Sequence, residues 1–139
     1  MYLADTDVIS ESRKASGADA GVRRFFREAV SLDHPVYVSA ISIGELRRGV
    51  EMIRYRGDRI QAAKLERWLN RVVQDYAESI LAFDADSAQV WGRLRVPHHE
   101  NALDKQIAAA ALIHDLTVVT RNVAHFESTG VRLLNPFEG

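Results

Sequence analysis

Acidic side chains recur at the ends of predicted strands and near the starts of predicted helices in this 139-residue sequence. Asp5-Thr6-Asp7 follows the apolar start Tyr2-Leu3-Ala4, and Glu45 and Asp104 lie near the start of later helical stretches. Carboxylates as close as Asp5 and Asp7 repel each other unless a proton or a metal ion lies between them. The chain has no cysteine, so its carboxylates would form a hard oxygen site suited to Mg²⁺ or Mn²⁺. If the acids converge, they predict metal-assisted hydrolysis of a phosphodiester.

Each acid also has a purely structural explanation. Ser42 and Glu45 fit a capping box, which would place Glu45 in the first turn of its helix. Asn101 and Asp104 can be interpreted in the same way, and Asp5 can cap the helix after the first strand. Capping does not explain why three acids should gather at one place, because Ser or Thr would cap a helix without collecting mutually repelling charges.

The elements that must position these acids alternate along the chain. Short apolar runs at residues 2–4, 36–38, 80–83, 117–120 and 131–134 predict strands, and they are separated by helical patterns at 43–53, 60–76, 88–94 and 103–114. This alternation predicts an α/β fold with a small, mainly parallel, buried sheet. Ligands of such sheets bind outside the carboxyl ends of the strands. We therefore expect Asp5, Glu45 and Asp104 to meet there, with Asn122 after the fourth strand.

Composition narrows the class of protein without identifying it. Hydrophobic residues make up 47% and charged residues 27% of the chain, which is typical of one soluble globular domain. Neither a signal peptide nor an apolar run of about 20 residues is present, so we expect a cytoplasmic protein that does not enter a membrane. The net charge of −1 conceals arginine clusters that could contact a polyanion, at residues 23–27, 47–48, 54–59 and 93–95.

Four stretches together resemble the PIN-domain ribonucleases, in particular the VapC/FitB-like toxins of type II toxin–antitoxin pairs. They are MYLADTDVISESRK, VSAISIGELRRGV, ENALDKQIAAAAL and LTVVTRNVAHF followed by GVRLLNP. The resemblance implies a single PIN domain over residues 1–139, with three α/β/α layers around a small parallel sheet. It also implies a toxic endoribonuclease that depends on Mg²⁺ or Mn²⁺ and hydrolyses RNA. The implied partner is a small VapB-like antitoxin, in a homodimer or a hetero-oligomer.

The same resemblance assigns roles to individual residues. Asp5 matches the first metal-ligand aspartate of the family, Glu45 the glutamate of its E-L-x-x-G stretch, and Asp104 the aspartate before I-A-A. We expect these three residues to be catalytic, with Asp5 and Asp104 as metal ligands and the set orienting the attacking water. Thr6 matches the threonine of the family's D-T-N.

The sequence departs from the family pattern in two places. Asp7 stands where the family usually has Asn, which adds a negative charge beside the site. Thr120-Arg121-Asn122 stands where many members have T-R-D, and His125 stands where relatives often have Asp. We therefore expect one well-held metal ion and at most a weak second one. Thr6, Asp7 and residues 120–122 are expected to contact substrate or support the ligands, and Arg121 is the candidate for a phosphate.

Two other functions remain open from the sequence. Asn122 is compatible with a catalytically weakened PIN domain that acts mainly as a binding partner in a complex with antitoxin and DNA. The D-x-D of Asp5 and Asp7 also resembles haloacid-dehalogenase-type phosphatases, in which the first Asp is the nucleophile and the second the general acid. That family has a small residue and Thr after the second Asp, whereas Val8 and Ile9 stand here.

Overall fold

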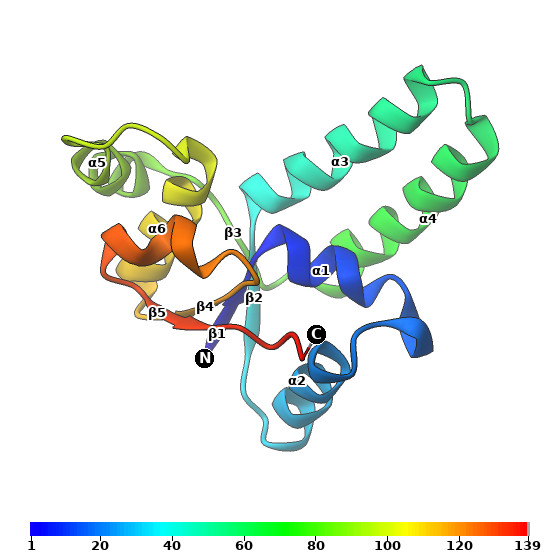
Figure 1. Cartoon of the computed structure of the whole chain (residues 1–139), viewed down its shortest axis with the longest axis horizontal. Coiled ribbons are helices and arrows are strands. Elements are labelled where there is room, and N and C mark those ends of the chain that lie inside the picture. Colours follow the sequence, from blue (N-terminus) through cyan, green and yellow to red (C-terminus); the bar gives the residue numbers. More distant parts are fainter. Residues whose placement is uncertain (139) are drawn as a thin grey trace.

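The computed structural model describes residues 1–138 and has a five-stranded, fully parallel sheet at its centre (Figure 1). The strands lie in the order β3-β2-β1-β4-β5. Their bounds are β1 Tyr2–Ala4, β2 Val36–Ser39, β3 Ile80–Leu81, β4 Thr117–Val119 and β5 Arg132–Leu134. The predicted small parallel sheet is confirmed, and each strand lies within one residue of its expected position except β3, which ends two residues early.

Helices α1 to α4 cover one face of the sheet. Their bounds are α1 Thr6–Ser12, α2 Ala20–Ser31, α3 Ala40–Tyr55 and α4 Arg59–Asp75. Alternate strand residues point toward this layer because side chains of a strand alternate between the two faces. Ala4, Val38 and Val119 are fully buried there, against apolar side chains of all four helices.

The opposite face is covered by α5 Ala85–Leu94, α6 Ala102–His114 and the 3₁₀ helix η2 Val123–Thr129. Leu3 and Val118 point to this side and pack against Ile107 and Phe126, all four of them with no exposed surface. The run of alanines from Ala108 to Ala111 lets α6 approach the sheet closely, and each of them is buried. The three-layer α/β/α architecture is therefore confirmed.

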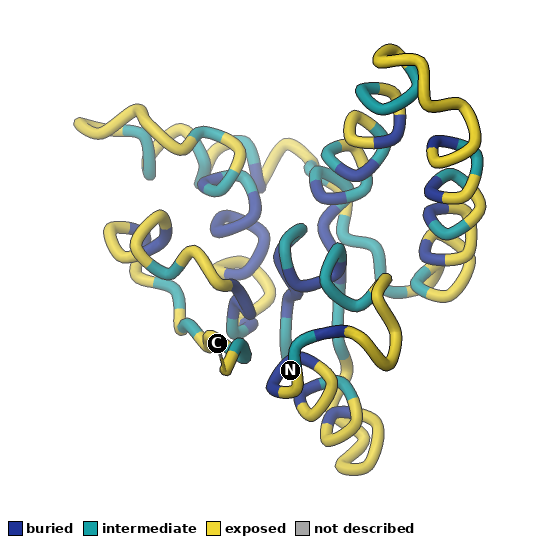
Figure 2. Tube along the Cα trace, turned by 45° about the vertical axis from the view of Figure 1, so that its right-hand side comes forward, coloured by how far each residue is buried: buried dark blue, intermediate teal, exposed yellow. Residues whose placement is uncertain are grey.

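Helices α3 and α4 form a hairpin that projects beyond the sheet (Figure 1). We call residues 40–75 the arm. The chain turns between the two helices at Gly57, whose φ of 96° lies in the left-handed region, and Asp58 then caps α4 by accepting from the Gln61 N–H at 3.0 Å. The buried residues of the arm lie where the two helices face each other, and its outer side is exposed (Figure 2).

The C-terminal segment returns to α2. Glu138 donates its backbone N–H to Asp19 at 3.1 Å and pairs with Arg24. A side chain at position 21 would meet the carbonyl oxygen of Pro136, which accounts for Gly21 on α2. Among residues 1–138, no helix has both the length and the apolar character needed to cross a bilayer.

Candidate active site at the carboxyl edge of the sheet

The candidate site lies where the direction of strand progression reverses. From β1 the sheet extends through β2 and β3 on one side and through β4 and β5 on the other. The chain leaves β1 at Asp5 and β4 at Thr120, side by side, with the Asp5 N–H donating to the Val119 carbonyl at 2.9 Å. Ligands of parallel α/β sheets bind at such reversal points. The position of the site thus follows from strand order alone.

Asp5 is buried and held by two donors. Its Oδ1 accepts from the Thr6 N–H at 2.8 Å and caps α1, while its Oδ2 accepts from the Thr120 hydroxyl at 2.8 Å. Only 4% of the residue is exposed. Burial, and then the charge of Asp7, raise the pKa of Asp5 from its ordinary 3.8 to about 7, although the two donors lower it. Asp5 is therefore a carboxylate whose charge the metal-free fold does not compensate.

Asp7 lies in the first turn of α1 and faces the same place as Asp5. Its Oδ2 accepts from the Arg121 N–H at 3.0 Å, whereas its Oδ1 is buried and has no hydrogen-bond partner. Burial raises the pKa of Asp7, and the charge of Asp104 adds to that effect. A buried carboxylate oxygen without a donor is costly unless a cation or a proton approaches it.

Glu45 is held from α1 and does not cap α3. The Thr6 hydroxyl donates to Glu45 Oε1 at 2.7 Å and lies 2.9 Å from the buried Ser42 hydroxyl. Helix α3 begins at Ala40, and Ser39 caps it by accepting from the Ile41 N–H at 3.1 Å. The capping-box interpretation of Ser42 and Glu45, and the first-turn position of Glu45, are therefore wrong because the helix starts earlier. Glu45 is free to face the site.

Asp104 lies in the first turn of α6, as predicted, and contacts a residue of η2. Its Oδ2 is 2.9 Å from His125 Nδ1. Asn101 has a left-handed backbone, with φ of 56°, and makes no side-chain cap, so the capping interpretation of that pair is also wrong. Lys105, the next residue, is buried and donates its ammonium to the His98 carbonyl. Lys105 thus anchors the loop before α6 and leaves Asp104 facing the pocket.

Most of the predicted site residues line one pocket of about 390 Å³. Its polar end is formed by Asp5, Thr6, Asp7, Glu45, Asp104 and Asn122. Its other walls come from α1, α3 and α4, through Ser10, Arg13, Leu46, Gly49, Val50, Ile53, Leu65 and Trp68. Six of the eight predicted site residues are therefore brought together, with an apolar groove leading from them onto the arm.

The two other predicted residues support the pocket without lining it. Thr120 is fully buried, donates to Asp5 and accepts from the Asn122 N–H at 2.9 Å. Arg121 directs its guanidinium away, 4.3 Å from the centre of the Phe137 ring. Two residues that contact the predicted site residues were not expected from the sequence: Ser42, which contacts Thr6, and Phe137, which contacts Arg121. Ser42 could have been found as a polar residue on the apolar face of a helix. Nothing in the sequence around Phe137 indicates its contact with Arg121.

The donor set fits a hard divalent cation. The site offers carboxylate and amide oxygens and no thiolate, and one buried oxygen of Asp7 has no partner. As the side chains lie, no three His, Asp or Glu residues within positions 1–138 are close enough to share an ion. In this arrangement Glu45 accepts from the Thr6 hydroxyl and Asp104 lies beside His125.

Comparison with known proteins agrees with this geometry. The PIN domain family matches residues 2–130. Toxin FitB of Neisseria gonorrhoeae is 33% identical over 142 residues and VapC ribonuclease Y4jK of Sinorhizobium fredii 31% over 144, each alignment covering 99% of both chains. A crystal structure of FitAcB from Neisseria gonorrhoeae has a TM-score of 0.84 at 32% identity, over 98% of both chains. A structure of FitAB bound to the IR36 DNA fragment has a TM-score of 0.82 at 30% identity, over 98% of this chain and 95% of that one.

These matches define the class of protein: the chain belongs to the PIN-domain family. Within the family it falls in the group of VapC- and FitB-like proteins, which confirms the resemblance found in the sequence.

Proposed function

We propose that this protein is the toxin of a type II toxin–antitoxin pair, a single PIN domain over residues 1–139 that cleaves RNA internally in the cytoplasm. The observation that carries the proposal is the convergence of Asp5, Glu45 and Asp104, from three separate elements, in one pocket at the carboxyl edge of the sheet. Membership of a family that includes a VapC ribonuclease gives this arrangement of acids its chemical interpretation.

In this proposal Asp5 and Asp104 would hold a Mg²⁺ or Mn²⁺ ion, and Glu45 would complete the catalytic set. Such an ion lowers the pKa of a bound water and neutralises charge on a phosphate. Thr120 fixes one oxygen of Asp5 and the Thr6 hydroxyl fixes one oxygen of Glu45. Held in this way, Glu45 would help to orient the attacking water. An apolar groove lies beside the acids, and a substrate or partner segment bound in it would exclude bulk water from the site.

A small VapB-like antitoxin is the proposed partner. Support comes from the similarity of this chain to the solved FitAcB and FitAB structures. Homodimerisation, or a hetero-oligomer with the antitoxin, is the expected state. The charged pocket is open to solvent in the chain by itself, so a partner segment that covers it would block substrate.

The decisive experiment uses purified protein freed of antitoxin, with structured RNA and Mg²⁺ or Mn²⁺. Cleavage is expected, and Asp5→Ala or Asp104→Ala should each reduce it by about 100-fold or more, as is typical when a group acting on the reacting atoms is lost. Activity that survives both substitutions would show that the cleavage comes from another site or a contaminant.

A binding-only function is the second candidate, because Asn122 adds an amide and no charge to the pocket. It predicts that the protein binds Mn²⁺ and antitoxin but cleaves no RNA under any metal condition. A D-x-D phosphatase would instead leave a phosphoryl group on Asp5 in a single-turnover, acid-quenched reaction. Cleavage of RNA without that intermediate would exclude the phosphatase.

A further inference from the structure

Charge is divided unevenly between the arm and the rest of the protein. Residues 40–75 contain eight basic and five acidic side chains, a formal charge of +3, whereas the remaining ten basic and fourteen acidic side chains give −4. The near-neutral total thus conceals a basic projection on an acidic body. A basic surface of this kind attracts polyanions and loses that attraction as salt increases.

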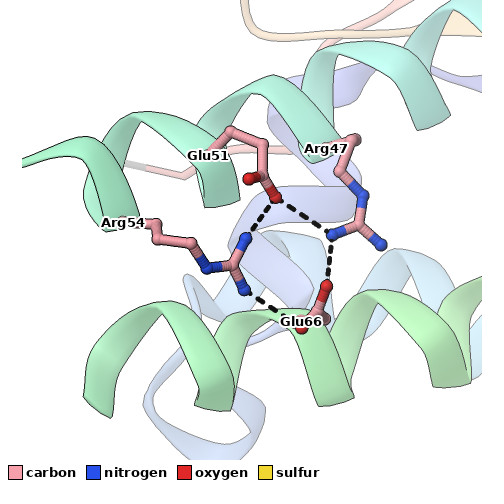
Figure 3. A network of polar contacts seen from close by, with 4 residues as sticks. All are labelled: Arg47, Glu51, Arg54 and Glu66. Carbon is pink, nitrogen blue, oxygen red and sulfur yellow. Dashed lines mark hydrogen bonds and ion pairs between the residues drawn. The ribbon is translucent and has the colours of Figure 1, made fainter. Parts of the chain in front are cut away.

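A four-residue ion-pair network joins the helices of the arm and uses few of its basic groups (Figure 3). Glu66 of α4 accepts from Arg47 at 2.6 Å and from Arg54 at 3.0 Å, and Glu51 contacts the same two arginines. The network is neutral overall. It holds α3 against α4 and engages two of the five acids of the arm.

Six basic side chains of the arm are exposed and make no ion pair within residues 1–138: Arg48, Arg56, Arg59, Lys64, Arg67 and Arg71. None of the other acids of the arm makes an ion pair with them within residues 1–138. Glu45 faces the pocket, Asp58 caps α4, and Asp75 ends that helix. The excess positive charge is therefore available to a partner.

Tyr55 is placed at the tip among these charges. The residue is 89% exposed, and it lines a shallow hollow with Arg48, Met52 and the network residues Glu51 and Arg54. Arg56 follows it directly and Arg59 begins α4. Exposed aromatic rings between cationic side chains bind unpaired bases, since the ring stacks on a base while the cations contact phosphates.

We infer that the tip of the arm is a second RNA-contacting surface, on which Tyr55 stacks with an unpaired base and Arg56 and Arg59 contact the phosphates beside it. This inference rests on the proposed ribonuclease function and extends it to single-stranded RNA. Tyr55 lies about 15 Å along α3 from Glu45, at 1.5 Å per residue. One strand can therefore reach both the cleavage site and the tip.

The test measures binding in the absence of cleavage. Fluorescence anisotropy with a labelled, mixed-sequence single-stranded RNA, in EDTA and over a series of salt concentrations, is applied to the full chain. Tyr55→Ala should weaken binding by roughly 5- to 150-fold, the effect of losing one stacked base, while Tyr55→Phe should bind like the wild type. Arg56→Ala combined with Arg59→Ala should reduce the slope of log K against log salt by about 1.4, at about 0.7 per phosphate.

The matched control removes equal charge elsewhere. Arg27 on α2 and Arg93 on α5 are also exposed and free of ion pairs within the described residues, and both helices lie away from the tip (Figure 1). Arg27→Ala with Arg93→Ala should leave affinity and salt slope unchanged. Equal loss in this control would overturn the inference, because binding would then depend on net charge alone.

Further outcomes separate this inference from the proposed function. With Mg²⁺, Tyr55→Ala should raise KM and leave kcat unchanged, because it removes binding away from the reacting atoms.

If the wild type cleaves RNA but Tyr55→Ala binds and cleaves RNA like the wild type, only the arm inference fails. If the wild type never cleaves RNA yet the arm variants bind it less tightly, the arm inference stands and the proposed function fails. If Tyr55→Ala separates a dimer in light scattering without changing RNA affinity, the tip is an interface between copies and the inference is wrong.

Discussion

Asp5→Asn should stabilise the metal-free protein, and the gain should depend on pH. Asp5 has a pKa of about 7 in the folded protein against an ordinary 3.8, so between these values the folded state binds more protons than the unfolded state. The free energy of unfolding therefore falls as pH rises through this window. At about 1.4 kcal/mol per unit, the loss from Asp5 is about 4 kcal/mol above pH 7, of which about 2.5 kcal/mol falls between about pH 5 and about pH 8.

The substitution removes this cost and adds a smaller one. An amide has one carbonyl oxygen, which would keep the hydrogen bond from the Thr6 N–H because that group can only donate. The amide nitrogen then faces the Thr120 hydroxyl, which must turn to accept, and this costs about 1 kcal/mol. The variant should be about 3 kcal/mol more stable than the wild type at about pH 8 and nearly equal to it at about pH 5.

Urea unfolding in EDTA at the two pH values, followed by circular dichroism, measures the free energy of unfolding of both proteins. The prediction concerns how the difference between variant and wild type changes with pH. Asp84→Asn is the matched control, because Asp84 caps α5 at an exposed site where hydrogen bonds with Ser87 lower its pKa. Asp84 is therefore ionised at both pH values, and the effect of that substitution should not change between them. A stability difference for Asp5→Asn that is the same at both pH values would refute the assignment of an uncompensated charge to Asp5.

Two further substitutions examine the groups around Asp5. Asp7→Asn should leave RNA cleavage intact and change the affinity for Mn²⁺ in a calorimetric titration. It should also raise the urea midpoint of the metal-free protein, because the repelling charge is lost while a carbonyl oxygen still accepts from the Arg121 N–H. A loss of cleavage as large as that of Asp5→Ala would contradict this prediction. Thr120→Val should raise the pKa of Asp5 further, because the hydroxyl donor lowers it in the wild type. The midpoint of the Asp5 carboxyl titration, followed by ¹³C NMR, should therefore move to higher pH. An unchanged midpoint would show that the hydrogen bond is not made in solution.

The positions of the strands and their ends were predictable because they depend on short buried runs. Residues 2–4 and 117–119 have no other place than the core, and once they are parallel neighbours, Asp5 and Thr120 must leave the sheet together. Asp104 was found at the first turn of its helix for a similar reason, since the alanine run after it can only face the sheet. Local apolarity therefore determined both the fold class and the place of the site.

Contacts between distant side chains could not be predicted in this way. Ser42 and Glu45 have the spacing of a capping box, but the helix starts at Ala40 because Ser39, at the end of β2, already supplies the cap. The stacking of Arg121 on Phe137 depends on how the C-terminal segment crosses to α2. The hydrophobic pattern of the sequence predicts neither the cap at Ser39 nor the contact of Arg121 with Phe137. Each depends on where two separate elements meet.

Capping and chemistry are not alternatives at Asp5. Capping uses Oδ1, which accepts from the Thr6 N–H, while Oδ2 faces Thr120 at the border of the pocket. A serine would cap α1 equally well without a buried charge. The carboxylate of Asp5 instead has a pKa that burial and the charge of Asp7 raise, and Asp7 itself has a buried oxygen without a partner. The cap accounts for one oxygen and leaves the cost of the charge unexplained, and that cost is what the cation proposed for this site would offset.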